Sequence, residues 1–180
     1  MNRRELLEKV GFGSLATASL VEALATPASA DDKRPVGFHF VCVSHAPTGN
    51  LVAMAGDGKT TASNVEGGGL FIIFNPSAPG VPKPILATGS WKAKRLISFN
   101  LVGTYGAAAS ADLNMVIHLV PEEGPVVEAT LEVVCNISVA GLSNPGKDEG
   151  FYLNLAGTTY VPLVPALGVT LFSVVNENRD

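Results

Sequence analysis

The residues best placed to do chemistry are a histidine and a glutamate that flank one predicted turn. Apolar and polar residues alternate on both sides of the segment 121–125, a pattern typical of an antiparallel hairpin with one buried face. If the turn is centred near residue 123, His118 faces Glu128 with about 4.5–5.5 Å between their Cβ atoms. A carboxylate that orients an imidazole can form a general base. His118 and Glu128 are therefore the candidate catalytic pair, although an ordinary surface pair is the plainer interpretation.

The same register places Val116 opposite Thr130 and Asn114 opposite Glu132. No serine or cysteine nucleophile can be placed beside His118 from the sequence. Glu128 and Glu132 share a face, but four residues of a strand span about 13 Å. The two carboxylates of a glycosidase lie about 5–9.5 Å apart, so this pair is too widely spaced for that reaction.

The two cysteines, Cys42 and Cys135, both fall on apolar faces of predicted strands. A thiol that faces the core lacks the exposed, electropositive surroundings that lower its pKa, which argues against a catalytic thiolate. A disulfide between Cys42 and Cys135 is favoured if the protein reaches an oxidising compartment. The alternative is two buried thiols that act as small apolar side chains.

His39, Cys42 and His45 suggest a metal site, but strand geometry argues against it. Cys42 points away from both histidines, and six residues separate the histidines by roughly 20 Å. We therefore expect no metal and no cofactor. The triplet 58–60 (Gly-Lys-Thr) matches the end of a phosphate-binding loop, but Ala53 stands where that motif requires glycine.

The only basic concentration is the segment 91–95 (Trp-Lys-Ala-Lys-Arg), which would suit an anionic polysaccharide. Trp91 has the parity of a core residue, so a solvated strand face is the preferred interpretation. The net charge of −4 gives no basic surface for nucleic acid. After residue 30 no run of 18 or more apolar residues could span a membrane.

The first thirty residues have the features of a secretory signal. Asn2-Arg3-Arg4-Glu5-Leu6-Leu7 resembles the twin-arginine motif, although Asn2 stands where serine or threonine is usual. A modestly apolar stretch follows, and Ala28-Ser29-Ala30 fits a small-x-small cleavage site. The resemblance implies a cleaved signal over 1–30 and export of one folded domain, 31–180, to a periplasm or the cell exterior. Cargoes of this pathway are exported folded, and some carry cofactors whereas others do not.

The elements that must position these residues are short strands. The 180-residue chain has 19 Gly, 12 Pro and only 16% charged residues, which suits many strands joined by turns. Leu70 to Phe74 is a continuous apolar run, as expected of a strand buried on both sides. The Gly-rich stretch 56–69 predicts a mobile loop, and Pro162 predicts an edge strand. Strands are expected at 38–44, 51–55, 70–74, 85–103 (one or two), 112–120, 127–139, 151–155, 159–163 and 168–175.

These patterns predict an all-β fold, a single antiparallel β-sandwich or small β-barrel of about 8–10 strands. The leading functional hypothesis is an exported binding or structural module whose partner is an unknown small molecule or protein. The alternative is a small β-barrel enzyme (a cyclase, isomerase or hydrolase) in which His118 acts on an apolar ligand. A metal or redox carrier is the third. An apolar cavity ringed by His118 would favour the enzyme, whereas a filled interior would count against it.

Overall fold

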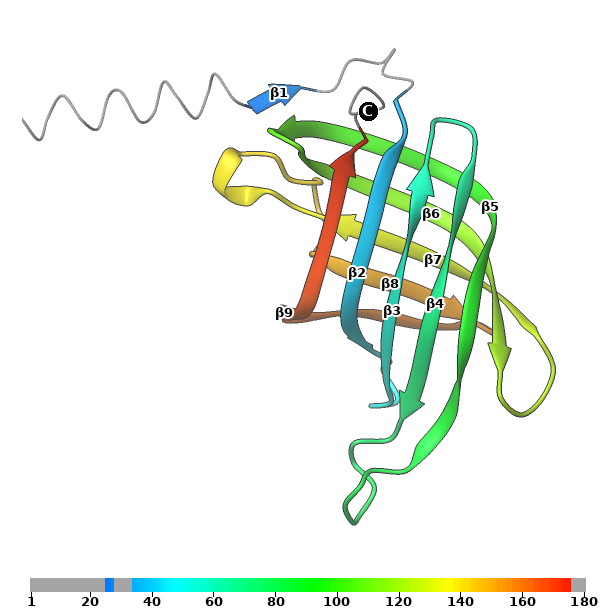
Figure 1. The fold of residues 1–180 in the computed structure, drawn as a ribbon. Coiled ribbons are helices and arrows are strands. Elements are labelled where there is room, and N and C mark those ends of the chain that lie inside the picture. The colour runs from blue at the N-terminus through cyan, green and yellow to red at the C-terminus, as the bar shows by residue number, and fades with distance from the viewer. Residues whose placement is uncertain (1–24, 28–33, 176–180) are drawn as a thin grey trace, which may run out of the picture.

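The chain folds into a closed antiparallel β-barrel. The computed structural model describes residues 25–27 and 34–175. Eight strands, β2 to β9, pair in chain order, and β9 also pairs with β2 to close the ring (Figure 1). The elements are β1 (Ala25–Pro27), β2 (Val36–His45), β3 (Leu51–Thr60), β4 (Val65–Phe74), β5 (Ile85–Tyr105), β6 (Ala108–Pro121), β7 (Val127–Cys135), the 3-10 turn η1 (Ser138–Ala140), β8 (Gly150–Leu155) and β9 (Thr158–Val174). The all-β prediction is confirmed, and closure decides for a barrel over a sandwich.

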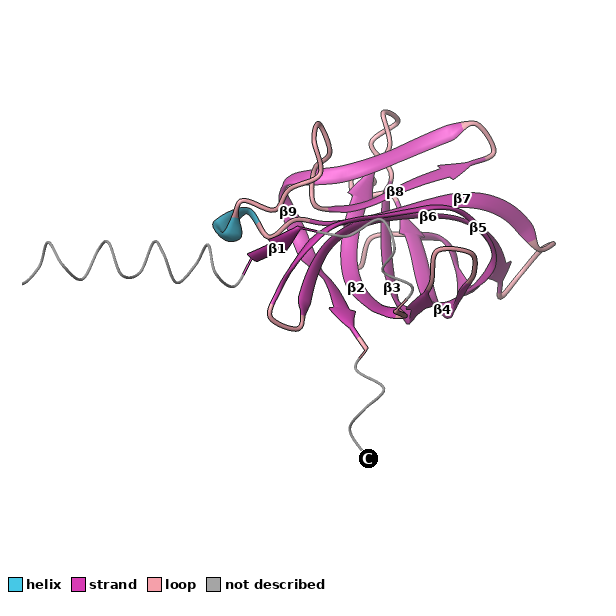
Figure 2. Cartoon of the chain, turned by 90° about the horizontal axis from the view of Figure 1, so that it is seen from above, coloured by secondary structure: helices cyan, strands magenta, loops and turns pink. Residues whose placement is uncertain are grey.

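The barrel is flattened into two layers that cross. β2, β3 and β4 lie in front and β6, β7 and β8 behind, while the long strands β5 and β9 bend from one layer into the other (Figures 1 and 2). Three residues of β5, namely Lys94, Ile97 and Val102, have no partner in its ladder with β6. Such bulges bend a strand and let it turn the corner between layers. They also change the side to which alternate residues point, so the core parity of Trp91 does not extend along the whole of β5.

β9 turns its corner with a larger insertion. Val43 of β2 pairs with Leu167, but the next residue, Ser44, pairs with Pro162. Residues 163–166 therefore bulge out of the ladder. β9 pairs with β2 on one side and β8 on the other, so the prediction that Pro162 marks an edge strand is wrong. A proline is accommodated here because it sits at the bulge.

Large apolar side chains fill the barrel. The ring of Phe40 lies 5.9 Å from those of both Trp91 and Phe151, and the ring of Phe172 lies 6.2 Å from Phe38. Tilted aromatic pairs at these distances are favourable beyond the burial of their surface. The largest fully buried residues are Phe40, Phe151, Phe172, Met54, Leu113, Met115, Ile117, Leu119, Leu131, Leu153, Val36 and Val52.

The Gly-rich stretch 56–69 is not a loop, contrary to the sequence-based expectation. β3 continues to Thr60 and β4 begins at Val65, so only a four-residue turn separates them. The glycines make room for an aromatic ring: a Cβ at Gly56 would lie 2.1 Å from Cζ2 of Trp91. The Trp91 indole N–H in turn donates to the carbonyl of Ala55 at 3.0 Å. These glycines serve packing in a strand rather than a turn.

The strand predicted over 127–139 is too long. β7 ends at Cys135, and η1 follows. Asn136 turns the chain here, because its side-chain oxygen accepts the backbone N–H of Asn144 at 2.7 Å. Val139 is consequently 92% exposed instead of facing the core.

The segment that resembles a twin-arginine motif and the predicted cleavage site at 28–30 lie outside the described residues. β1, inside the predicted signal, pairs with residues 103–105 of β5 and is not part of the closed ring. Within the described part of the chain, no helix is long and apolar enough to cross a membrane.

Candidate functional site

The predicted hairpin places His118 and Glu128 opposite each other. β6 and β7 pair His118 with Glu128, Val116 with Thr130 and Asn114 with Glu132, so the predicted register is confirmed. The His118 Nε2 atom lies 3.7 Å from a Glu128 carboxylate oxygen, and the side chains are 37% and 62% exposed. A pair this exposed contributes at most about 1 kcal/mol to stability.

Lys94 joins this pair and was missed from the sequence. Its ammonium donates to Nε2 of His118 at 3.0 Å and lies 3.8 Å from Glu128. Lys94 is a bulge residue of β5 and lies close to Lys92, which pairs with His118. The sequence does not show that this strand lies beside His118. Nε2, the His118 nitrogen nearest the Glu128 carboxylate, therefore accepts a hydrogen bond from the Lys94 ammonium.

His118 points away from the barrel interior. Its neighbours on β6, Ile117 and Leu119, are buried and help to fill that interior. The cavity ringed by His118 that the enzyme hypothesis requires is therefore not formed by the described residues. The catalytic role of His118 and Glu128 stays a prediction.

Cys42 and Cys135 are both buried and free, so the predicted disulfide is wrong. The Cys42 thiol donates to the carbonyl of Val169 at 3.2 Å, and the Cys135 thiol to that of Thr170 at 3.5 Å. Each thiol is thus engaged by a different carbonyl of β9. Burial and the nearby charge of Glu149 raise the pKa of Cys42 to about 11, which suppresses thiolate chemistry.

The outer surface of β6 and β7 carries an ion cluster that ties a loop to the barrel. Lys147, from the segment after η1, forms ion pairs with Asp112 of β6 and with Glu132 of β7, the latter at 2.5 Å. Burial lowers the pKa of Lys147, but the two carboxylates outweigh it and raise that pKa overall. Among the described residues no group of three or more His, Cys, Asp or Glu side chains is arranged to hold a metal ion.

In the described part of the chain, the outer side of β9, β2, β3 and β4 carries exposed apolar side chains. Cross-strand pairing builds two apolar rows there, one Leu167–Val43–Ala53–Ile72 and the other Val169–Val41–Ala55–Leu70. We call these eight residues, with Leu171, the outer apolar face. Its large members Val41, Leu70, Ile72, Leu167, Val169 and Leu171 are 40–65% exposed.

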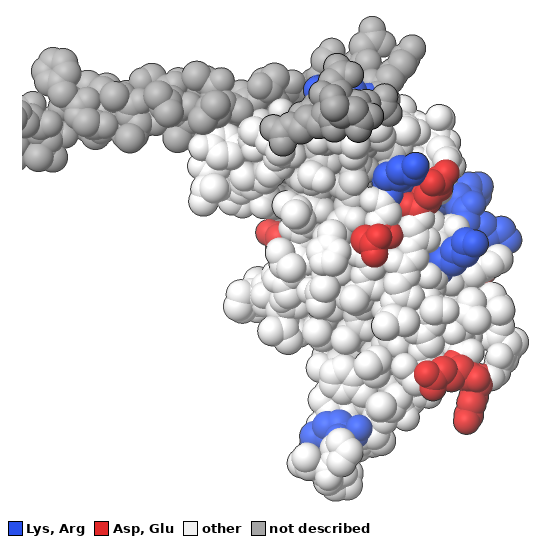
Figure 3. Space-filling model, in the orientation of Figure 1, with Lys and Arg blue, Asp and Glu red and all other residues white. Residues whose placement is uncertain are grey.

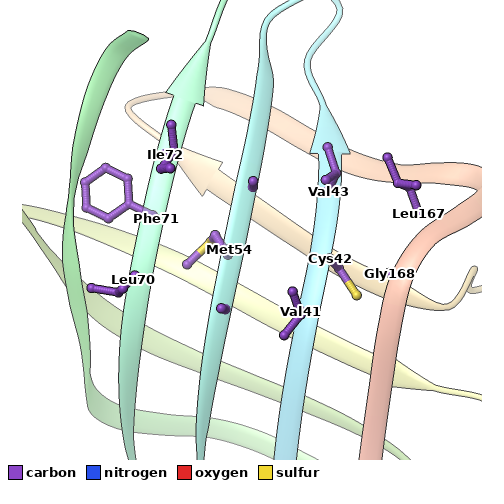
Figure 4. Close-up of a pocket in the computed structure, with 11 residues that line it drawn as sticks. Val41, Cys42, Val43, Met54, Leu70, Phe71, Ile72, Leu167 and Gly168 are labelled. Carbon is purple, nitrogen blue, oxygen red and sulfur yellow. The ribbon is translucent and has the colours of Figure 1, made fainter.

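The outer apolar face is grooved along its middle. Each row has alanine on β3, between a valine on β2 and a larger side chain on β4, and the small alanines leave a groove of about 430 Å³. Val41 and Val43 of β2 lie on one side of the groove, and Leu70 and Ile72 of β4 lie on the other. Leu167 of β9 lies beyond Val43, on the β2 side (Figure 4). The thiol of Cys42 is the sole polar side-chain group among the residues that line the groove.

Polar residues border the face. On β5, Thr88 and Ser90 pair with Ile72 and Leu70, and the row beyond Val41 continues with His39 and Asp57. The front of the molecule is largely free of charge over the face, and charged side chains gather toward its margins (Figure 3). Contiguous apolar surface with a polar rim is typical of an interaction site.

One sequence pattern, an apolar run in β4, indicates this face. The run Leu70 to Phe74 predicted a strand buried on both sides, yet Leu70 is 65% exposed and only Phe71 and Ile73 are buried. One chain thus buries one side of β4 and leaves the other side exposed to solvent.

Comparisons of the chain with protein-family models, curated proteins and solved structures found no match.

Proposed function

We propose that this protein is an exported β-barrel module that acts by binding through its outer apolar face. The observation that carries the proposal is the contrast between a filled barrel interior and an exposed, contiguous apolar surface on the same molecule. A filled barrel is a rigid scaffold, and its outer strands hold the face in a fixed shape. Small-molecule sites combine an apolar lining with a few precisely placed polar groups. This groove offers apolar contacts but almost no polar side chains that could orient a small molecule. We therefore favour an apolar protein surface as the partner.

Export is the second part of the proposal. It is supported by the twin-arginine resemblance of residues 2–7 and by the small residues at 28–30. The closed ring consists of β2 to β9 and needs no residue before Val36. A signal that ends at Ala30 can therefore be removed without opening the barrel.

The export proposal is tested by replacing the arginine pair, Arg3→Lys with Arg4→Lys, and fractionating the host cells. We expect wild-type protein outside the cytoplasm with a mass that corresponds to residues 31–180, and the double variant retained at full length inside. Unprocessed wild-type protein in the cytoplasm would contradict export.

The binding role of the face is tested with the apolar dye 8-anilinonaphthalene-1-sulfonate on the folded protein at low concentration. We expect dye fluorescence that falls several-fold in Leu70→Glu, because a charge at the groove wall disfavours an apolar ligand. Val139→Glu is the matched control, since Val139 is also exposed but lies in η1 and is not a residue of the outer apolar face. Equal dye binding by both variants would overturn the assignment of the face.

A further inference from the structure

We propose that the outer apolar face is occupied by a second copy of this chain, so that the protein is a dimer whose two faces pack together. This inference rests on the proposed function, since it names the partner of the same face. Its argument comes from the sequence pattern of β4, the shape of the face, its area and its charge.

The first observation is the composition of the outward positions. Outward residues of a strand that meets water are normally polar. In the two rows, the outward positions of β2, β3 and β4 are valine, alanine, leucine or isoleucine instead. This is the pattern of strands covered on both sides, and one chain covers only the inner side. A permanent partner supplies the missing layer.

The second observation is an apolar ridge beside the groove. Residues 163–166 are inserted in β9 where it runs beside β2, and Val164 to Val169 are all exposed and carry no polar side chain. Gly168 permits the ridge to lie against β2, because a Cβ there would sit 2.0 Å from the carbonyl oxygen of Val41. Leu167 and Gly168 of this ridge also line the groove, so ridge and groove lie side by side on one face. Two copies related by a twofold axis can therefore each place a ridge near the groove of the other.

The third observation is area. A dimer interface of ordinary size buries about 800 Å² per partner, of which about 65% is apolar, or roughly 500 Å². Six large side chains about half exposed, with the alanines and the ridge, offer apolar surface on the order of 400–500 Å². The face is thus close to the size that a stable homodimer requires.

The fourth observation is charge. The chain has a net charge of −4, so two copies repel unless their charges are kept apart. The face meets this condition because charged side chains gather at its margins rather than on its two apolar rows (Figure 3). A membrane partner is less well matched. Lys59 and Lys92 lie beside the rows, but Lys59 forms an ion pair with Glu66, and Asp57 on the same border repels anionic headgroups.

The test is sedimentation velocity and native mass spectrometry on the purified protein from about 1 to 100 µM, a range suited to dissociation constants near the micromolar level. We expect a species of twice the protomer mass. Leu70→Glu should weaken association by at least about 100-fold, because a twofold arrangement buries two like charges. Val139→Glu should leave association unchanged, and far-UV circular dichroism checks that each variant is folded.

A second variant keeps the test informative if Leu70→Glu disturbs folding. Leu167→Ser shortens the exposed ridge and should also shift the equilibrium toward monomer. A protein that is monomeric at 100 µM but binds dye at the face overturns the second-copy proposal and leaves the proposed function standing. A monomer whose dye binding is insensitive to Leu70→Glu overturns both. A dimer that neither variant weakens overturns the assignment of this face as its interface.

Discussion

At the scale of single residues, Lys147 shows how a loop is attached to the barrel. Its ammonium neutralises Asp112 and Glu132, whose side chains are only 12% and 20% exposed. Burial is the largest influence on Glu132 and raises its pKa above the ordinary value of 4.5, even with Lys147 beside it. Removing Lys147 would leave two partly buried carboxylates without a counter-charge.

The raised pKa of Glu132 predicts how its replacement depends on pH. Because the folded pKa exceeds the unfolded one, ionised Glu132 disfavours folding at neutral pH. Compared with Glu132→Gln, the wild type should therefore gain stability as pH falls through the raised pKa, and the gain should be complete below about pH 4.5. Urea unfolding of both proteins between pH 4 and 8 measures this difference. A wild type that loses stability relative to the variant on acidification would contradict it.

The two thiols carry a second prediction at this scale. Since Cys42 and Cys135 are buried and free, iodoacetamide at pH 8 should label neither in the folded protein and both after denaturation without reductant. Mass spectrometry counts the labels. A denatured protein that takes up label only after reduction would show a disulfide instead.

The pairing of His118 with Glu128 could be predicted from sequence, whereas Lys94 could not. The pairing follows from a strict alternation on both sides of one short turn, so register is set locally. Lys94 comes from β5, and the sequence does not show that this strand lies beside His118. A disulfide was favoured because both cysteines face the core. Two residues can face the same core without their sulfur atoms being close enough to bond.

At the scale of elements, the glycines of β3 and β4 explain the largest error. A Gly-rich segment is typical of a loop when read locally. Here Gly56 and Gly69 lie beneath Trp91 of β5, and the indole takes the space that their side chains would need. Only the neighbouring strand explains these glycines, and sequence does not show which strand is the neighbour.

This packing predicts a difference between two glycines in strands. Gly56→Ala should lower the free energy of unfolding by about 1–3 kcal/mol, because the new methyl group meets Trp91 and the carbonyl of Gly68. Gly37→Ala is the control: its nearest neighbour is the Ser173 hydroxyl at 3.3 Å, and the change should stay within about 1 kcal/mol. Denaturant unfolding followed by Trp91 fluorescence compares them. Equal losses would show that the indole does not need the space above Gly56.

At the scale of the whole molecule, the fold class followed from the pattern of short alternating strands, but closure did not. Closure depends on β2 and β9, which are far apart in sequence and pair without any local turn to indicate it. The outer apolar face was equally hidden, since its two rows are assembled from four strands. Its components were visible one strand at a time, most clearly in the run from Leu70 to Phe74.

The position of β1 predicts the effect of removing residues 1–30, the predicted signal. A chain that begins at Asp31 lacks β1, whose three residues pair only with the end of β5. We expect its far-UV circular dichroism to show the same strand content and its free energy of unfolding to change by less than about 1 kcal/mol. A truncated chain without a cooperative unfolding transition would contradict the independence of the ring from residues 1–30.

The seam between β2 and β9 also sets the order of events during synthesis. Val36 pairs with Val174, so the ring cannot close until nearly the whole chain has left the ribosome, and such non-local pairing folds slowly. Until then β2 and β8 present unpaired edges, which are templates for other chains. A nascent chain stalled before Thr158 should therefore aggregate, whereas the released chain protects its own edges.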